Sequence, residues 1–145
     1  MWQSVLNYFQ GLRTYGDLSP DRAVRRQVNQ QLRHRPTLSF EAWSSLFAEQ
    51  REVTLSPGLL KFVYIHLEQY SGLEIGRVRP GDRLVEDLQI PLVCWFDWSY
   101  QLCDDFYNTF QIDISDEFDE ALQETVGDLV YSLNRYLQSR DSVPF

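Results

Sequence analysis

RPGDRLVEDLQ (residues 79–89) opens the stretch that decides the fold. A long aromatic segment follows it, and then the motifs FQIDISDEFDE (110–120) and TVGDLVYSL (125–133). At 100° per residue, the apolar side chains between these motifs gather on one side of a helix over 92–110. The stripe that we predict to be buried consists of Leu92, Trp95, Phe96, Ser99, Leu102, Cys103, Phe106 and Phe110.

The opposite face of this predicted helix is polar and acidic, with Cys94 and Trp98 at its margin. A Trp beside carboxylates is typical of an anchor in a protein interface. An ordinary solvated face remains the alternative. We predict that a partner binds through Asp97, Trp98, Gln101, Asp104, Asp105 and Asn108.

Helix-start and helix-stop residues divide the rest of the chain. Ser19-Pro20, Ser39 and Ser56-Pro57 each place a capping side chain before a helix, and Gly72 suits the position after one. With the apolar spacing, they predict helices over 2–15, 20–34, 40–51, 57–70, 92–110, 117–122 and 124–139. We therefore predict an all-α fold, with a helical extension over 1–55 and a helical bundle over 56–140.

The first motif resembles that of acyl carrier proteins, Asp-x-x-Leu-x-x-Asp-Leu-Gly-x-Asp-Ser-Leu. The matching residues are Asp82, Leu84, Glu86, Asp87 and Leu88, but no Asp-Ser-Leu follows them. The position of the phosphopantetheine arm falls near Leu92 or Phe96, and neither side chain can be esterified. The chain is thus similar to degenerate, serine-less, carrier-like bacterial proteins. That resemblance implies an acyl-carrier-like bundle without the cofactor, whose acidic helix is gripped by Arg and Lys of partner proteins.

Composition and charge exclude several classes of protein. The chain has 145 residues, is 43% hydrophobic and carries a net charge of −8, so a folded core is expected. Residues 1–36 hold six Arg against two Asp, which leaves −12 for the remainder. An acidic surface argues against nucleic acid as the partner. No apolar run is long enough to span a membrane, and no signal peptide is evident, so we expect a cytoplasmic protein.

Catalytic and metal-binding patterns are not found in the sequence. His34 and His66 have no metal-ligand spacing, and no phosphate loop, nucleophile elbow or dinucleotide motif occurs. The run Asp113 to Glu124 imitates a calcium loop, but Phe118 occupies the place that requires Gly. Its carboxylates are expected to cap helix N-termini instead. We predict no catalytic residue, no cofactor and no metal.

These observations together predict a non-catalytic adaptor or assembly factor that binds a protein with a basic surface. A homodimer is left open. The alternative function is a lipid or acyl-chain-binding protein that uses the interior of the bundle. A carrier modified at an unusual serine, Ser99, is a third class, although the sequence around Ser99 fits the carrier motif badly.

The missing Asp-Ser-Leu predicts that no phosphopantetheine becomes attached. Intact mass spectrometry after incubation with coenzyme A and a promiscuous phosphopantetheinyl transferase should show an unchanged mass. A stoichiometric adduct on any serine, Ser99 included, would contradict the prediction.

Overall fold

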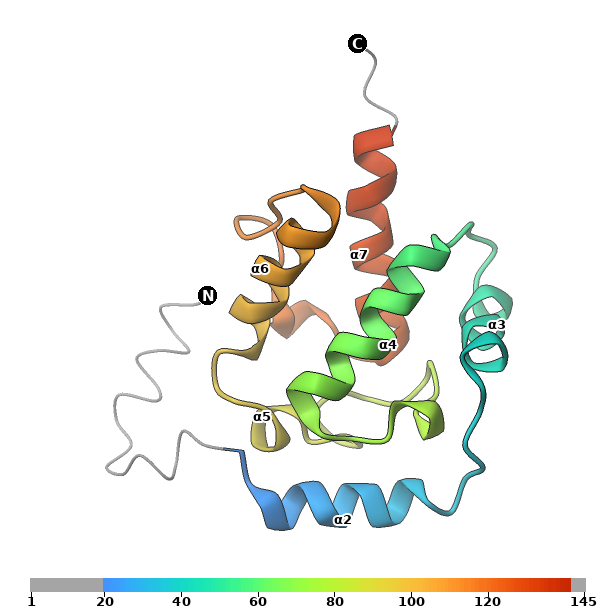
Figure 1. Ribbon diagram of the computed structural model, residues 1–145, viewed down its shortest axis with the longest axis vertical. Coiled ribbons are helices and arrows are strands. Elements are labelled where there is room, and N and C mark those ends of the chain that lie inside the picture. Colours follow the sequence, from blue (N-terminus) through green and yellow to red (C-terminus); the bar gives the residue numbers. More distant parts are fainter. Residues whose placement is uncertain (1–19, 142–145) are drawn as a thin grey trace.

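The computed structural model describes residues 20–141, and in this range the fold is all-α (Figure 1). An isolated bridge between Arg83 and Thr125 is the sole β-type pairing among the described residues. The predicted helix over 2–15 and the predicted cap at Ser19 lie outside them. The α-helices are α2 (Arg22–Leu32), α3 (Phe40–Gln50), α4 (Pro57–Ser71), α5 (Ile90–Val93), α6 (Trp98–Phe110) and α7 (Val126–Asp141), with 3-10 turns η2 (Ile75–Arg77) and η3 (Glu120–Leu122).

Capping residues set most helix boundaries. The Ser39 hydroxyl accepts a hydrogen bond from the Ala42 N–H at 3.2 Å, and the Ser56 hydroxyl accepts one from the Leu59 N–H at 3.3 Å. Gly72 ends α4 with a φ of +69°, in the left-handed region that favours glycine. These three expectations are confirmed. Helix α2 instead begins after Asp21, whose carboxylate accepts the N–H groups of the second and third helical residues.

The single helix predicted over 92–110 is wrong, because the chain breaks between α5 and α6. Cys94 has an extended backbone, with φ −99° and ψ 163°, and it ends α5. The prediction of which side chains before the break face the core is therefore wrong. Leu92 and Trp95, predicted to be buried, are each 49% exposed, whereas Trp98 is 6% exposed. Beyond the break the predicted phase holds, since Ser99, Leu102 and Phe106 are buried.

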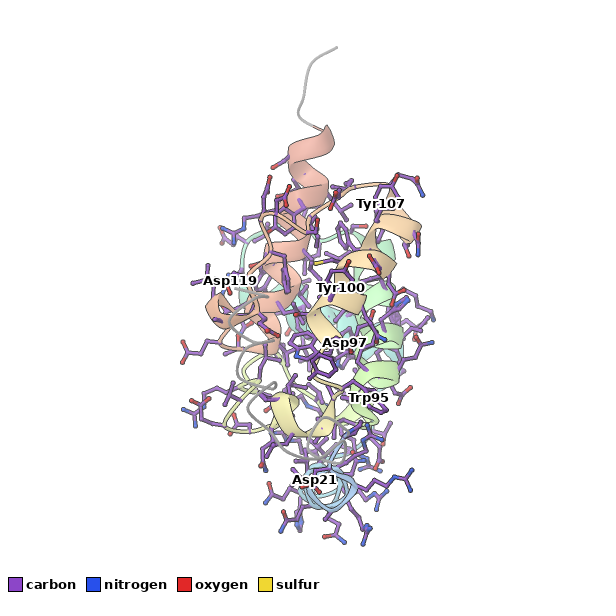
Figure 2. The ribbon with its side chains drawn as sticks, turned by 90° about the vertical axis from the view of Figure 1, so that its left-hand side faces the viewer. Asp21, Trp95, Asp97, Tyr100, Tyr107 and Asp119 are labelled. Carbon is purple, nitrogen blue, oxygen red and sulfur yellow. The ribbon has the colours of Figure 1, made fainter. Side chains whose placement is uncertain are left out.

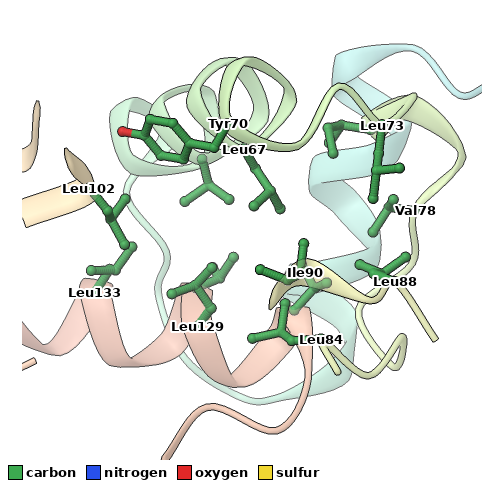
Figure 3. Packing of buried hydrophobic residues seen from close by; sticks show 14 of the residues in the cluster. Leu67, Tyr70, Leu73, Val78, Leu84, Leu88, Ile90, Leu102, Leu129 and Leu133 are labelled. Atoms are coloured by element: carbon green, nitrogen blue, oxygen red, sulfur yellow. The ribbon is translucent and has the colours of Figure 1, made fainter. Parts of the chain in front are cut away.

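One hydrophobic cluster runs through the described residues. Helix α4 lies in the middle, packs against α3 and α7, and has α2 across the base of the molecule (Figure 1). Figure 3 shows part of the core, where Leu67 and Tyr70 of α4 face the same interior as Leu102 of α6 and Leu133 of α7. Helices α2 and α3 add Val28, Leu32, Trp43 and Phe47 to the same cluster, so the predicted boundary at residue 55 does not separate two cores.

A buried carboxylate joins three parts of the chain. Asp82 binds the Arg35 guanidinium through both oxygens, at 2.6 and 2.8 Å, and also accepts the Arg79 N–H at 2.7 Å. Its carbonyl accepts the N–H of Val126, the first residue of α7, at 2.9 Å. The segment after α2, the loop before α5 and the start of α7 therefore meet at one residue.

Replacing Asp82 should destabilise the protein strongly. Asp82→Ala leaves a guanidinium and a backbone N–H without their partner, so the free energy of unfolding should fall by about 3 kcal/mol. Glu86→Ala is the matched control in the same loop, because its carboxylate is exposed and lies 4.0 Å from Arg83. It should change the stability by less than about 0.5 kcal/mol. Urea unfolding measures both variants, and equal losses would contradict the role given to Asp82.

Candidate protein-binding surface

The acidic charge of the protein is concentrated in one continuous stretch. Residues 84–134 contain twelve Asp and Glu and no Lys, Arg or His. In the structure this stretch covers α5, α6, the loop to η3 and the first half of α7. The uninterrupted absence of cations can be read from the sequence, and it marks this part of the molecule as the acidic side.

The six residues predicted to bind a partner do not all lie on the surface. Gln101, Asp104 and Asn108 are exposed on α6, and Asp97 is half-buried immediately before that helix. The Asp97 carboxylate does not cap the N–H groups of α6. These four residues therefore remain candidates for contact with a partner.

Trp98 does not belong to this surface, because its side chain is buried in the core. The chain break before α6 rotates Trp98 inward and Trp95 outward. Trp95 therefore occupies the exposed position that the sequence analysis gave to Trp98. The prediction of Trp98 as an interface anchor is wrong.

Asp105 has a partner within the protein. Its carboxylate accepts a hydrogen bond from the Tyr70 hydroxyl, which ties α6 to α4. Burial of Tyr70 and this hydrogen bond both raise the pKa of the phenol. Asp105 is thus a structural contact between two helices, and its half-buried carboxylate is less available to another protein.

Three large aromatic side chains are exposed beside the remaining carboxylates. Trp95, Tyr100 and Tyr107 are 49%, 51% and 49% exposed, and Figure 2 shows them on one side of the molecule together with Asp97. None of the three was predicted from the sequence to lie on the surface. The helical wheel could have predicted the exposure of two of them, because Tyr100 and Tyr107 lie about 20° apart on it and close to Asp104.

We call this surface the aromatic–acidic face. A groove of about 430 Å³ lies within it, between α6 and the loop that follows. Asp113 and Ser115 form the loop side of the groove, where the Asp113 carboxylate accepts the Ser115 hydroxyl at 2.6 Å and its N–H at 3.0 Å. These two hydrogen bonds lower the pKa of Asp113, so the groove keeps its negative charge. The face consists of Trp95, Asp97, Tyr100, Gln101, Asp104, Tyr107 and Asn108.

The carboxylates that follow the groove stabilise turns and helix starts. Asp119 caps η3 by accepting the Ala121 N–H at 2.9 Å, as expected from the sequence. Thr125 and Asp128 exchange two hydrogen bonds at the start of α7, each of 3.0 Å. Within residues 20–141, no group of three or more His, Cys, Asp or Glu is placed to hold a metal ion.

Both cysteines are free thiols. Burial is the largest cause that raises the pKa of Cys94, to about 12, and that of Cys103, to about 11. Because the thiolate is the reactive form, both side chains are protonated and weakly nucleophilic at neutral pH. Cys103 lines the groove without adding a reactive group to it.

Comparisons of the chain with protein-family models, with curated proteins and with solved structures found no match. The resemblance to acyl carrier proteins therefore rests on the sequence motifs alone. No helix in the described part of the chain is both long and apolar enough to cross a membrane.

Glu120, which is hydrogen-bonded to Ser99 of α6, should make stability depend on pH. Burial raises its pKa above the ordinary 4.5, and the charge of Asp119 adds to this against the lowering effect of the Ser99 hydrogen bond. The folded state therefore binds this proton more tightly than the unfolded state. The contribution of protonated Glu120 to the free energy of unfolding is lost as pH rises through the pKa of the folded state.

Glu120→Gln should consequently be more stable than the parent protein at neutral pH, and the difference should vanish as pH falls toward 4.5. Urea unfolding at a series of pH values measures it. Glu124→Gln, at an exposed position, is the matched control. A Glu120→Gln variant that is less stable than the parent at neutral pH would show that the carboxylate is stabilised by its surroundings.

Proposed function

We propose that the chain is a non-catalytic adaptor or assembly factor that binds a basic protein partner through the aromatic–acidic face. The observation that carries the proposal is the exposure of Trp95, Tyr100 and Tyr107 beside the carboxylates of Asp97 and Asp104. Large aromatic side chains are the commonest anchors of protein interfaces. A surface that offers several of them on one side is suited to a partner.

Charge supports the basic character of the partner. The face belongs to the stretch without Lys, Arg or His, so it repels acidic surfaces and nucleic acid. Carboxylates around aromatic anchors speed the encounter with a cationic protein and help to select it. The resemblance to acyl carriers, whose partners grip an acidic helix through Arg and Lys, supports the same arrangement. Two free thiols support a cytoplasmic location.

The acyl-chain alternative draws no such support. The inward residues of α4, α6 and α7 belong to one buried cluster, and Figure 3 shows Leu102 of α6 against Leu133 of α7. An acyl chain would have to displace these contacts, and each displaced leucine contributes about 1.5–3 kcal/mol through its burial.

Single substitutions on the face test the proposal. The partner is first captured from the native host and identified, and its affinity is then measured by titration. Trp95→Ala and Tyr107→Ala should each cost about 2 kcal/mol or more, roughly a thirty-fold loss of affinity. Asp104→Asn should slow association and reduce its dependence on salt.

Two exposed apolar residues that are not part of the face serve as controls, Ile65 of α4 and Leu122 of η3. Ile65→Ala and Leu122→Ala should leave the affinity within about twofold. A partner that binds the face variants as tightly as these controls would show that the binding surface lies elsewhere.

A further inference from the structure

The first described residues of the chain lie next to α5, at the Trp95 end of the aromatic–acidic face. The Asp21 N–H donates to the Leu92 carbonyl at 2.8 Å, and the Arg25 guanidinium donates to the Val93 carbonyl at 2.7 Å. Figure 2 shows Asp21 below Trp95, on the side of the molecule where Tyr100 and Tyr107 lie. The residues before Asp21 therefore start next to the face, held there by two hydrogen bonds between α2 and α5.

The sequence before this anchor is amphipathic. Residues 1–19 lie outside the described residues, but their apolar side chains have the helical spacing noted above. At 100° per residue these side chains fall within a sector of about 120°. Asn7 lies about 160° from Phe9, on the polar side. The apolar stripe consists of Trp2, Val5, Leu6, Phe9 and Leu12.

The distances allow this stripe to reach the face. Residues 13–20 can span about 26–29 Å when extended, at 3.3–3.6 Å per residue. Helix α6 has 13 residues and is about 20 Å long. The connecting residues are thus longer than α6 itself, so they allow the stripe to lie along that helix. Tethering beside the face also gives the segment an effective concentration in the millimolar range.

We propose that residues 2–12 bind the aromatic–acidic face of their own chain, with the stripe from Trp2 to Leu12 packed on Trp95, Tyr100 and Tyr107. A stripe of Trp, Val, Leu and Phe matches exposed aromatic rings, which lose unfavourable contact with water when they are covered. The segment is then an internal competitor for anything else that binds the face. This inference requires the face alone, and it stands whether or not the proposed adaptor function is correct.

Hydrogen exchange of the full chain tests the inference. The amides of residues 2–12 should exchange more slowly than those of an unstructured peptide. Trp95→Ala combined with Tyr107→Ala should raise their exchange rates roughly tenfold, the ratio that corresponds to about 1.4 kcal/mol. Ile65→Ala is the control at an exposed apolar residue elsewhere, and it should leave these rates unchanged.

The reciprocal measurement follows the indole N–H signal of Trp95 by NMR. Phe9→Asp should shift this signal, whereas Asn7→Asp, which adds the same charge on the polar side of the segment, should leave it in place. Unprotected amides in residues 2–12 would overturn the proposal, as would protection that survives loss of both aromatic rings. Protection that disappears on dilution would overturn it in favour of a second copy of the chain as the occupant. If no partner protein bound the face in the titrations described above, the exchange and NMR results would still decide whether residues 2–12 bind it.

Discussion

The ion pair between Asp82 and Arg35 is the interaction on which the arrangement of the helices depends. A buried carboxylate is tolerated when its hydrogen-bonding capacity is filled, and Asp82 fills it with Arg35 and the Arg79 N–H. Its carbonyl simultaneously begins α7. Helix α7 can approach this loop because its second residue is Gly127, where an added Cβ would lie 3.1 Å from the Pro80 carbonyl oxygen. The loop position, the direction of α2 and the start of α7 are thus set together.

Three arginines of the first third of the chain bind groups elsewhere in this internal framework. Arg25 binds the Val93 carbonyl, Arg33 pairs with Glu74 at 2.8 Å, and Arg35 binds Asp82. Hydrogen bonding to Asp82 raises the pKa of Arg35, which keeps it charged. The excess of cations over residues 1–36 therefore overstates the positive charge available to a partner. Counting charges along a sequence cannot distinguish a guanidinium in water from one that donates to a carbonyl elsewhere in the fold.

Local signals were sufficient for most helices and insufficient for the aromatic segment. A capping serine before α3 and α4 and a glycine after α4 act through atoms a few residues away, so the sequence alone predicts them. Residues 92–98 read LVCWFDW, in which six of seven side chains are apolar. Such a run fits a helix in almost any phase, and periodicity cannot determine which side is buried. The choice is made by tertiary packing, which buries Cys94 and Trp98 and leaves Trp95 outside.

The break before α6 is also what adds a tryptophan to the two exposed tyrosines of the surface. A continuous helix over 92–110 would have turned Trp95 toward the core with Leu102 and left Tyr100 and Tyr107 outside among the carboxylates and amides, without a tryptophan beside them. With the helix starting at Trp98, Trp95 instead lies on the side that carries Tyr100 and Tyr107 (Figure 2). Carboxylates alone would support a weak, salt-sensitive encounter, because exposed charge pairs contribute about 0–1 kcal/mol each. Aromatic rings add apolar area that can be covered, and so convert an acidic side of the molecule into a surface able to hold a binding segment.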